Sequence, residues 1–298
     1  MKNPDEPTAE EFPSEETMKL YDGKITSLFT KAKEQDEKEF MSSILYFTGI
    51  MTFSRSYDVA RELKETVELF FNISGLRNTN PEIISVQNFF KLGLLVYCHI
   101  IETYPTLEFL YNLALLAQGK NYELFPFGNS EEKKINEDEI DKTIKELCSE
   151  TAFENKKKII SKLSYALRIT EMPVTARMEM VVSESKKADV SLEEILLDFY
   201  DKDIRNAFSH GLYALDDNGL MLIKKNKHIS YKDLLDKITK ALYFFTVLSS
   251  QADDVLRALP PEKESKFVGR LGEMSITPNY EGNFVSYNIQ STSLSRHI

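Results

Sequence analysis

The chain is poor in the residues that make turns and cross-links. Its 298 residues include 11 glycines, 10 prolines, two cysteines and no tryptophan. Glycine and proline together fall below the roughly 12% usual for soluble proteins, which argues against an all-β sandwich with its many tight turns. Two cysteines cannot form a disulfide framework or a zinc site of paired Cys-x-x-Cys type.

Long apolar runs are also missing. The longest uncharged run, residues 40–54, covers 15 residues and is shorter than the ~20 that span a bilayer. The N-terminal residues are rich in Glu and Pro and do not form a basic segment followed by an apolar stretch. We therefore expect no membrane association and, with so few cysteines, a reducing cytoplasmic location.

Excess positive charge is the third absence. Lys and Arg number 37 against 47 Asp and Glu, a net charge of -10, which excludes binding of nucleic acid through bulk positive charge. Residues 1–17 carry six acids, one lysine and three prolines, a composition that predicts a disordered acidic tail. Any nucleic-acid site must then be local.

The sequence does contain dense helix signals, and the predicted fold class is mainly α, a helical bundle. We assign residues 18–260 to one elaborated helical domain. Residues 212–224 form two short apolar runs around Asn218-Gly219, which predicts a β-hairpin between the last two long helices. Ser230 followed by Asp233 is expected to cap the second of these helices. Residues 261–298 are rich in Ser and Asn and are expected to be a C-terminal tail or an arm packing on a partner.

The first of the two helices carries the residues of most interest. With Ser191 as N-cap and Gly211 just past its end, residues 191–211 predict one helix of about nineteen residues. On a wheel of 100° per residue, Asp203, Asn206 and His210 fall on its apolar stripe. Buried polar groups need partners, so these three side chains predict either a satisfied core network or a functional site.

The end of this predicted helix resembles the signature of HEPN domains. That signature is an Arg followed a few residues later by His, with a polar residue after the Arg, and here it reads Arg205-Asn206-Ala207-Phe208-Ser209-His210. The helix end, the following hairpin and the capped long helix are similar too. The resemblance covers residues 191–260, the motif-bearing core, with the earlier helices completing the bundle.

The resemblance implies a homodimer in which Arg and His from both subunits line one cleft and cleave RNA without a metal or other cofactor. His210 would be the general acid or base, Arg205 would stabilise charge on the phosphate, and Asn206 would orient one of them, with Asp203 supporting. Arg205 and His210 point about 140° apart on an ideal helix, so the two can act together only if the helix end unwinds or a second subunit completes the site. A role as a toxin or antiviral defence effector under a regulatory protein partner rests on the same resemblance.

Charged residues near the motif give both an argument against RNA binding and an argument for it. The predicted helix has a local net charge of -3, which repels phosphate. Lys224, Lys225 and Lys227 form a basic strip just after the hairpin and are candidates for RNA binding. A solvated hairpin edge explains the same lysines without function.

Other chemistry has weaker signals. His99 and Glu102 stand three residues apart, as metal ligands can, but no second pair of that kind is present, so we expect no metal site. Cys98 and Cys148 lie among apolar residues and are expected to be inert.

Two alternatives to the ribonuclease remain. One is a non-catalytic helical interaction module in which Asp203, Asn206 and His210 form a polar network that fixes dimer register. The other is a HEPN-like module that senses a nucleotide and signals to a partner.

Overall fold

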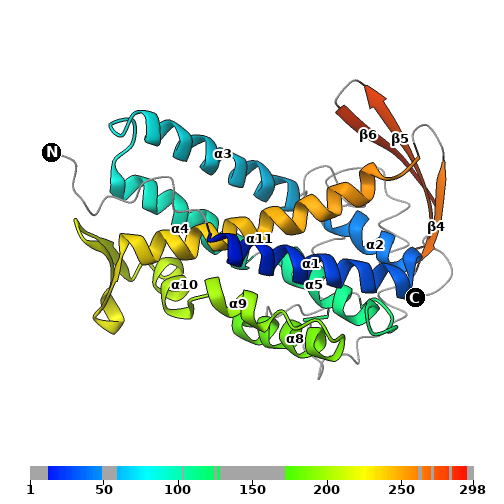
Figure 1. The fold of residues 1–298 in the computed structure, drawn as a ribbon, viewed down its shortest axis with the longest axis horizontal. Coiled ribbons are helices and arrows are strands. Elements are labelled where there is room, and N and C mark those ends of the chain that lie inside the picture. The colour runs from blue at the N-terminus through cyan, green and yellow to red at the C-terminus, as the bar shows by residue number, and fades with distance from the viewer. Residues whose placement is uncertain are drawn as a thin grey trace, which may run out of the picture.

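Helices make up most of the described residues, which confirms the mainly α class (Figure 1). The computed structural model describes residues 13–48, 59–102, 104–123, 126–127, 172–260, 264–269, 272–281 and 284–293. The helices are α1 (Glu15–Gln35), α2 (Glu37–Phe47), α3 (Val59–Thr79), α4 (Val86–Glu102), α5 (Tyr104–Leu116), α8 (Val174–Lys187), α9 (Glu193–Phe199), α10 (Lys202–Ser209) and α11 (Tyr231–Arg257). In the described part of the chain, no helix has the length and apolar character needed to cross a membrane.

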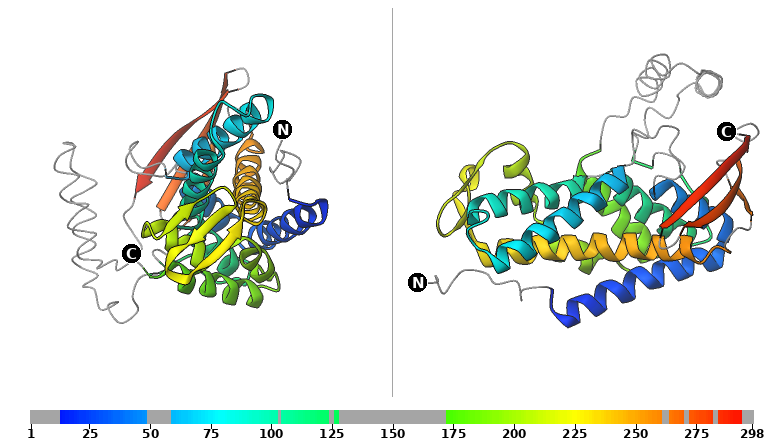
Figure 2. Two further views of the ribbon diagram at one scale, coloured as in Figure 1. Left: turned by 90° about the vertical axis from the view of Figure 1, so that its left-hand side faces the viewer. Right: turned by 90° about the horizontal axis from the view of Figure 1, so that it is seen from above.

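The helices pack around α11, the longest of them. It runs along the long axis of the molecule, with α1 and α4 beside it (Figures 1 and 2). The helix α9 packs on α11, whereas α10 contacts α4. The candidate motif therefore lies at the end of the bundle where α11 begins (Figure 1).

Short polar side chains begin several of these helices. Ser14 Oγ accepts a hydrogen bond from the Thr17 amide at the start of α1. At the start of α11, Ser230 Oγ accepts from the Asp233 amide at 3.1 Å, which confirms that cap. Such caps satisfy amides that have no partner within the helix. The helix α1 begins before Met18, the expected start of the helical domain.

Aromatic side chains are the largest members of a mainly aliphatic core. The largest completely buried ones include Tyr21, Tyr97, Phe90, Phe199 and Phe244. The rings of Phe199 and Phe244 lie 5.0 Å apart between α9 and α11. Each buried aromatic side chain contributes about 1.5–3 kcal/mol through the hydrophobic effect, and this core fixes the position of α9.

The predicted hairpin is confirmed and has a third strand. Strands β1 (Tyr213–Leu215), β2 (Gly219–Leu222) and β3 (Lys227–Ser230) form an antiparallel sheet in that order. Asp216 shapes the first turn, because its Oδ1 accepts from the amides of Asn218 and Gly219 at 2.8 and 3.1 Å. A short 3-10 helix (Ile223–Lys225) joins β2 to β3.

A second antiparallel sheet lies in the segment that the sequence leaves as a tail or an arm. It contains β4 (Ser265–Gly269), β5 (Gly272–Glu281) and β6 (Phe284–Ser293) in that order. The two sheets lie at opposite ends of α11 (Figure 1). The first twelve residues of the predicted acidic tail, and Cys148, lie outside the described residues.

Candidate functional site

The segment predicted as one helix is broken in two. Instead of running from Ser191 to Gly211, it forms α9 and α10, separated at Tyr200 and Asp201. Both residues have extended backbone angles, with ψ of 120° at Tyr200 and 109° at Asp201. The prediction of a continuous helix of about nineteen residues is therefore wrong.

Two side chains account for the break. Asp201 is the N-cap of α10, and its Oδ1 accepts from the amides of Asp203 and Ile204 at 2.8 and 3.0 Å. The hydroxyl of Tyr97, on α4, donates to the Phe199 carbonyl at 3.0 Å and accepts from the Asp201 amide at 2.8 Å. These bonds satisfy backbone groups that a continuous helix would pair internally.

The other end of α10 is the one that the sequence predicts. Gly211 has φ of +65°, and its amide donates to the Phe208 carbonyl at 3.1 Å. The Leu212 amide donates to the Ala207 carbonyl at 2.8 Å. This pair of bonds is a Schellman motif, which needs a left-handed residue and so favours glycine. His210 is consequently the C-cap residue of α10.

The break changes which side chains face the core. Ile204 and Ala207 are the buried residues of α10. Asp203 and Asn206 are half-buried and His210 is exposed, so the expectation that these three lie on the buried face is wrong. The helical wheel assumes a constant rotation of 100° per residue. It therefore gives the wrong direction for side chains of α10, because the helix is interrupted after α9.

Arg205 is held by two side chains at the surface of α10. Its Nε donates to Glu102 Oε1 at 2.7 Å, and its Nη1 donates to Asn206 Oδ1 at 2.9 Å. Ser209 Oγ donates to the same Glu102 oxygen at 2.6 Å. The Arg205 side chain is 26% exposed. Its guanidinium is thus oriented, partly accessible and paired with a carboxylate at the end of α4.

His210 does not belong to this cluster. Its ring makes no hydrogen bond or ion pair with any residue that the structure describes. Arg205 is on α10 and His210 is its C-cap residue, but no hydrogen bond joins the two side chains in the described part of the chain. Within one subunit the structure therefore brings together Arg205, Asn206, Glu102 and Ser209, and leaves His210 apart.

The lysines of the basic strip lie against acidic residues at the start of α10. Lys225 Nζ is 3.7 Å from Asp203 Oδ1, and Lys227 Nζ is 3.9 Å from Asp201 Oδ2. Asp203, expected to support catalysis, is thus the partner of a lysine. Lys224 is exposed and has no ion pair within the described part of the chain. The two paired lysines partly offset the negative charge of Asp201 and Asp203 at the start of α10.

Glu102 and Tyr97 are the site residues that sequence reasoning missed. In the sequence, the only signal at Glu102 was its spacing from His99, which is typical of metal ligands. Among the described residues, no group of three or more His, Cys, Asp and Glu is arranged to hold a metal. Cys98, between Tyr97 and His99, is buried; burial and the Glu102 charge raise the pKa of its thiol to about 12. Both effects disfavour the thiolate, which is the reactive form of cysteine.

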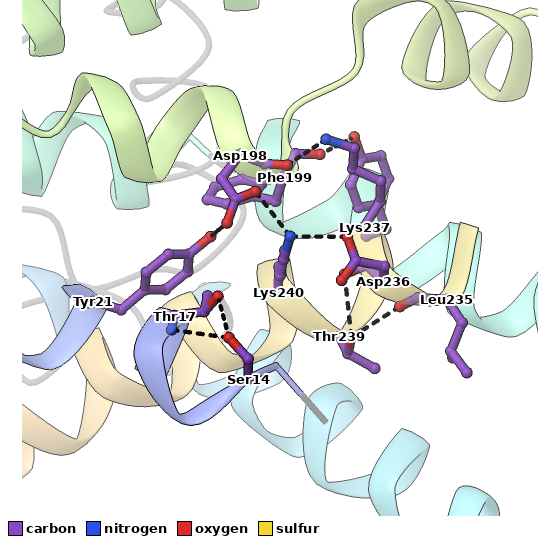
Figure 3. A network of polar contacts seen from close by, with 11 residues as sticks. Ser14, Thr17, Tyr21, Asp198, Phe199, Leu235, Asp236, Lys237, Thr239 and Lys240 are labelled. Carbon is purple, nitrogen blue, oxygen red and sulfur yellow. Dashed lines mark hydrogen bonds and ion pairs between the residues drawn. The ribbon is translucent and has the colours of Figure 1, made fainter. Parts of the chain in front are cut away.

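A second polar network holds α9 on the bundle (Figure 3). Asp198 accepts from the Tyr21 hydroxyl at 3.0 Å and pairs with Lys240 Nζ at 2.8 Å. Lys240 also pairs with Asp236 at 2.9 Å, and Lys237 donates to the Asp198 carbonyl. Burial, then Asp198, raises the pKa of Tyr21. Burial lowers the pKa of Lys240, but its bonds to Asp198 and Asp236 outweigh this and raise it. The network joins α1, α9 and α11 just before the break.

Comparisons of the chain with protein-family models, with curated proteins and with solved structures find no match.

Proposed function

We propose that this chain is a HEPN-like, metal-independent endoribonuclease that acts as a homodimer. The observation that carries the proposal is the arrangement at α10: Arg205 is oriented by Glu102 and Asn206, while the exposed ring of His210 at the C-cap has no partner among the described residues. In metal-independent RNA cleavage a fixed cation can stabilise charge on the phosphate, and an imidazole without other partners can act as general acid or base.

In the proposed reaction the 2′-oxygen of a ribose attacks the adjacent phosphorus, and the bond from phosphorus to the 5′-oxygen breaks. The neutral ring of His210 takes the proton from the 2′-hydroxyl. The protonated ring of His210 of the partner subunit gives a proton to the leaving 5′-oxygen. Arg205 stabilises the added negative charge on the phosphate oxygens. The products are a 2′,3′-cyclic phosphate and a 5′-hydroxyl.

The geometry of α10 is the reason for including a second subunit in the proposal. Arg205 and His210 are five residues apart, and side chains at that spacing diverge by about 140° on a helix. The Arg205 cluster contacts α4, whereas His210 lies at the exposed end of α10. A phosphate bound to Arg205 of one subunit would therefore meet the imidazole of the other.

The surface near the site is less positively charged than a typical RNA-binding surface, and so attracts phosphate less strongly. Glu102 neutralises Arg205 in the free protein, and Asp203 and Asp201 contact Lys225 and Lys227. Phosphates must compete with these carboxylates for the same cations. Lys224, which is free of such a contact in the described structure, is the first lysine available to the RNA backbone.

The test is cleavage of a mixed pool of RNAs with a chelator present. Arg205→Ala and His210→Ala are compared with wild type and with two matched controls, Arg257→Ala and His228→Ala, which remove an Arg and a His elsewhere. We expect both site variants to lose activity at least 100-fold and both controls to retain it, with cyclic phosphate ends on the products. Absence of cleavage by the wild type, or equal loss in the controls, contradicts the proposal.

One observation favours the non-catalytic interaction module instead. Arg205 already has a carboxylate partner, so the cluster with Asn206 and Ser209 is a satisfied polar network. In that case a second copy of the chain would pack against the end of α10 without cutting RNA. A dimer in solution that is lost in Arg205→Ala, together with an inactive wild type, would support this function.

A further inference from the structure

The hydroxyl of Tyr97 bridges the break between α9 and α10. It donates to the Phe199 carbonyl at 3.0 Å and accepts from the Asp201 amide at 2.8 Å. Tyr97 is completely buried, so these two bonds are formed away from bulk water. An unpaired backbone group in such a place is costly, and the hydroxyl satisfies one donor and one acceptor at once.

The break determines what α10 presents to solvent. If α9 continued without interruption, Asp203, Asn206 and His210 would turn towards the core. With the break, Ile204 is buried beside Ala207, Asp203 and Asn206 are half-buried, and His210 is exposed. The exposure of His210 is therefore a consequence of the interruption at Tyr200 and Asp201.

The cap of α10 cannot set this direction by itself. Asp201 accepts hydrogen bonds from the amides of Asp203 and Ile204 in its own helix, and such a cap works wherever a helix begins. Its other contact is a long ion pair, 3.9 Å, with the exposed Lys227. Tyr97 binds from another helix, α4, which also carries Glu102, the partner of Arg205. The two α4 residues hold α10 at its start and along its length.

We propose that Tyr97 is a positioning residue, whose hydroxyl fixes the α9–α10 break and thereby presents His210 at the surface. The effect on the direction of α10 stands on the contacts above. Only its effect on catalysis rests on the proposed ribonuclease function.

The test uses Tyr97→Phe, which removes the hydroxyl and retains the ring that packs in the core. Amide hydrogen exchange of Asp201 and the rate at which diethyl pyrocarbonate modifies His210, relative to His228, are measured in the full chain. We expect Asp201 exchange to be at least tenfold faster in Tyr97→Phe and the relative modification rate of His210 to change at least threefold. In the wild type the Asp201 amide is expected to be protected, and an unprotected amide overturns the proposal without any variant.

Two control variants separate positioning from general loss of stability. Tyr243→Phe removes another hydrogen-bonded hydroxyl, the one that contacts Asp22, and should leave both readouts unchanged. Asp201→Ala removes the cap side chain while Tyr97 stays in place, and should change the relative modification rate of His210 less than Tyr97→Phe does. A folded Tyr97→Phe protein whose His210 reacts as in wild type overturns the proposal, as does an equal change in Asp201→Ala.

Activity gives an independent readout if the chain cleaves RNA. Because Tyr97 does not touch substrate, we expect Tyr97→Phe to lower kcat at least tenfold and to change KM less than threefold. A wild type that cleaves no RNA contradicts the proposed function, but the exchange and modification results then still decide the role of Tyr97.

Discussion

Arg205 and Glu102 form an ion pair of 2.7 Å between α10 and the end of α4, although the two residues are 103 positions apart in the chain. The side chains are 26% and 37% exposed, respectively. At this exposure the pair contributes little to folding, roughly 0–1 kcal/mol. Its larger effect is on charge, because the carboxylate cancels the cation that the proposed phosphate would bind.

The first prediction follows from that cancellation. Glu102→Gln removes the negative charge but keeps an oxygen that can accept from Arg205. If Arg205 binds RNA, the dissociation constant for a short RNA should fall about three- to tenfold at low salt, and the gain should shrink as salt is added. Fluorescence anisotropy measures this. Glu82→Gln, which removes the same charge from an exposed turn, should have no such effect; equal tightening in both variants contradicts a site at Arg205.

The second prediction concerns the network at Asp198. Lys240→Met leaves the Asp198 and Asp236 carboxylates without their shared cation, and the Lys240 side chain is only 16% exposed. We expect a loss of about 1–3 kcal/mol in the free energy of unfolding, measured with urea. Lys19→Met breaks the exposed pair with Glu15 and should cost less than about 0.5 kcal/mol. Equal losses would show that the network contributes nothing beyond a surface pair.

The third prediction is a dependence of stability on pH. Burial opposes ionisation of Glu184, but hydrogen bonds from Lys187, Gln118 and Lys120 lower its pKa from 4.5 to about 2. Since the unfolded chain binds this proton more readily, the stabilisation is complete above pH 4.5 and is lost as the pH falls towards 2.

Glu184→Gln should remove that part of the dependence. We expect the variant to be about 1–3 kcal/mol less stable than wild type at pH 7 and to approach it near pH 2. Glu15→Gln, on an exposed residue, is the control and should run parallel to wild type. A constant difference between Glu184→Gln and wild type across this range contradicts the assigned shift.

The fourth prediction tests the turn beside the candidate site. Gly219 has φ of +152°, and a Cβ there would lie 2.1 Å from the Ile229 carbonyl oxygen in the neighbouring strand. Gly219→Ala should therefore destabilise the β1–β3 sheet by about 2 kcal/mol or more. Gly75, inside α3, has open space around the same position, and Gly75→Ala should stabilise by about 0.5–1 kcal/mol. If Gly219→Ala does not change the free energy of unfolding, strands β2 and β3 can move apart at this position without cost.

Local signals account for the parts of the fold that the sequence predicts. Three such signals act within a few residues, and the structure has all of them. They are the cap at Ser230, the Asp216–Gly219 turn and Gly211 at the C-terminal end of α10. Strand β3 was missed because it has a single buried apolar residue, Ile229, and two of its four residues are Lys227 and His228.

The site could be predicted only in part, because its decisive contacts are distant in sequence. Arg205, Asn206 and His210 follow from the motif, and their roles remain a prediction. The partners Tyr97 and Glu102 come from α4, more than a hundred residues earlier. A helical wheel considers only neighbours in the chain, so it could not detect the break that a tyrosine from another helix stabilises.

The bond from Tyr97 to Asp201 also has a consequence for the order of folding. It joins residues 104 positions apart, and closing so long a loop is slow compared with forming a helix locally. Before α4 docks, only the local cap at Asp201 favours the break in residues 193–209. The final direction of α10 should then be acquired late, in the same step that assembles the core, so that His210 takes its exposed place only in molecules whose core has formed.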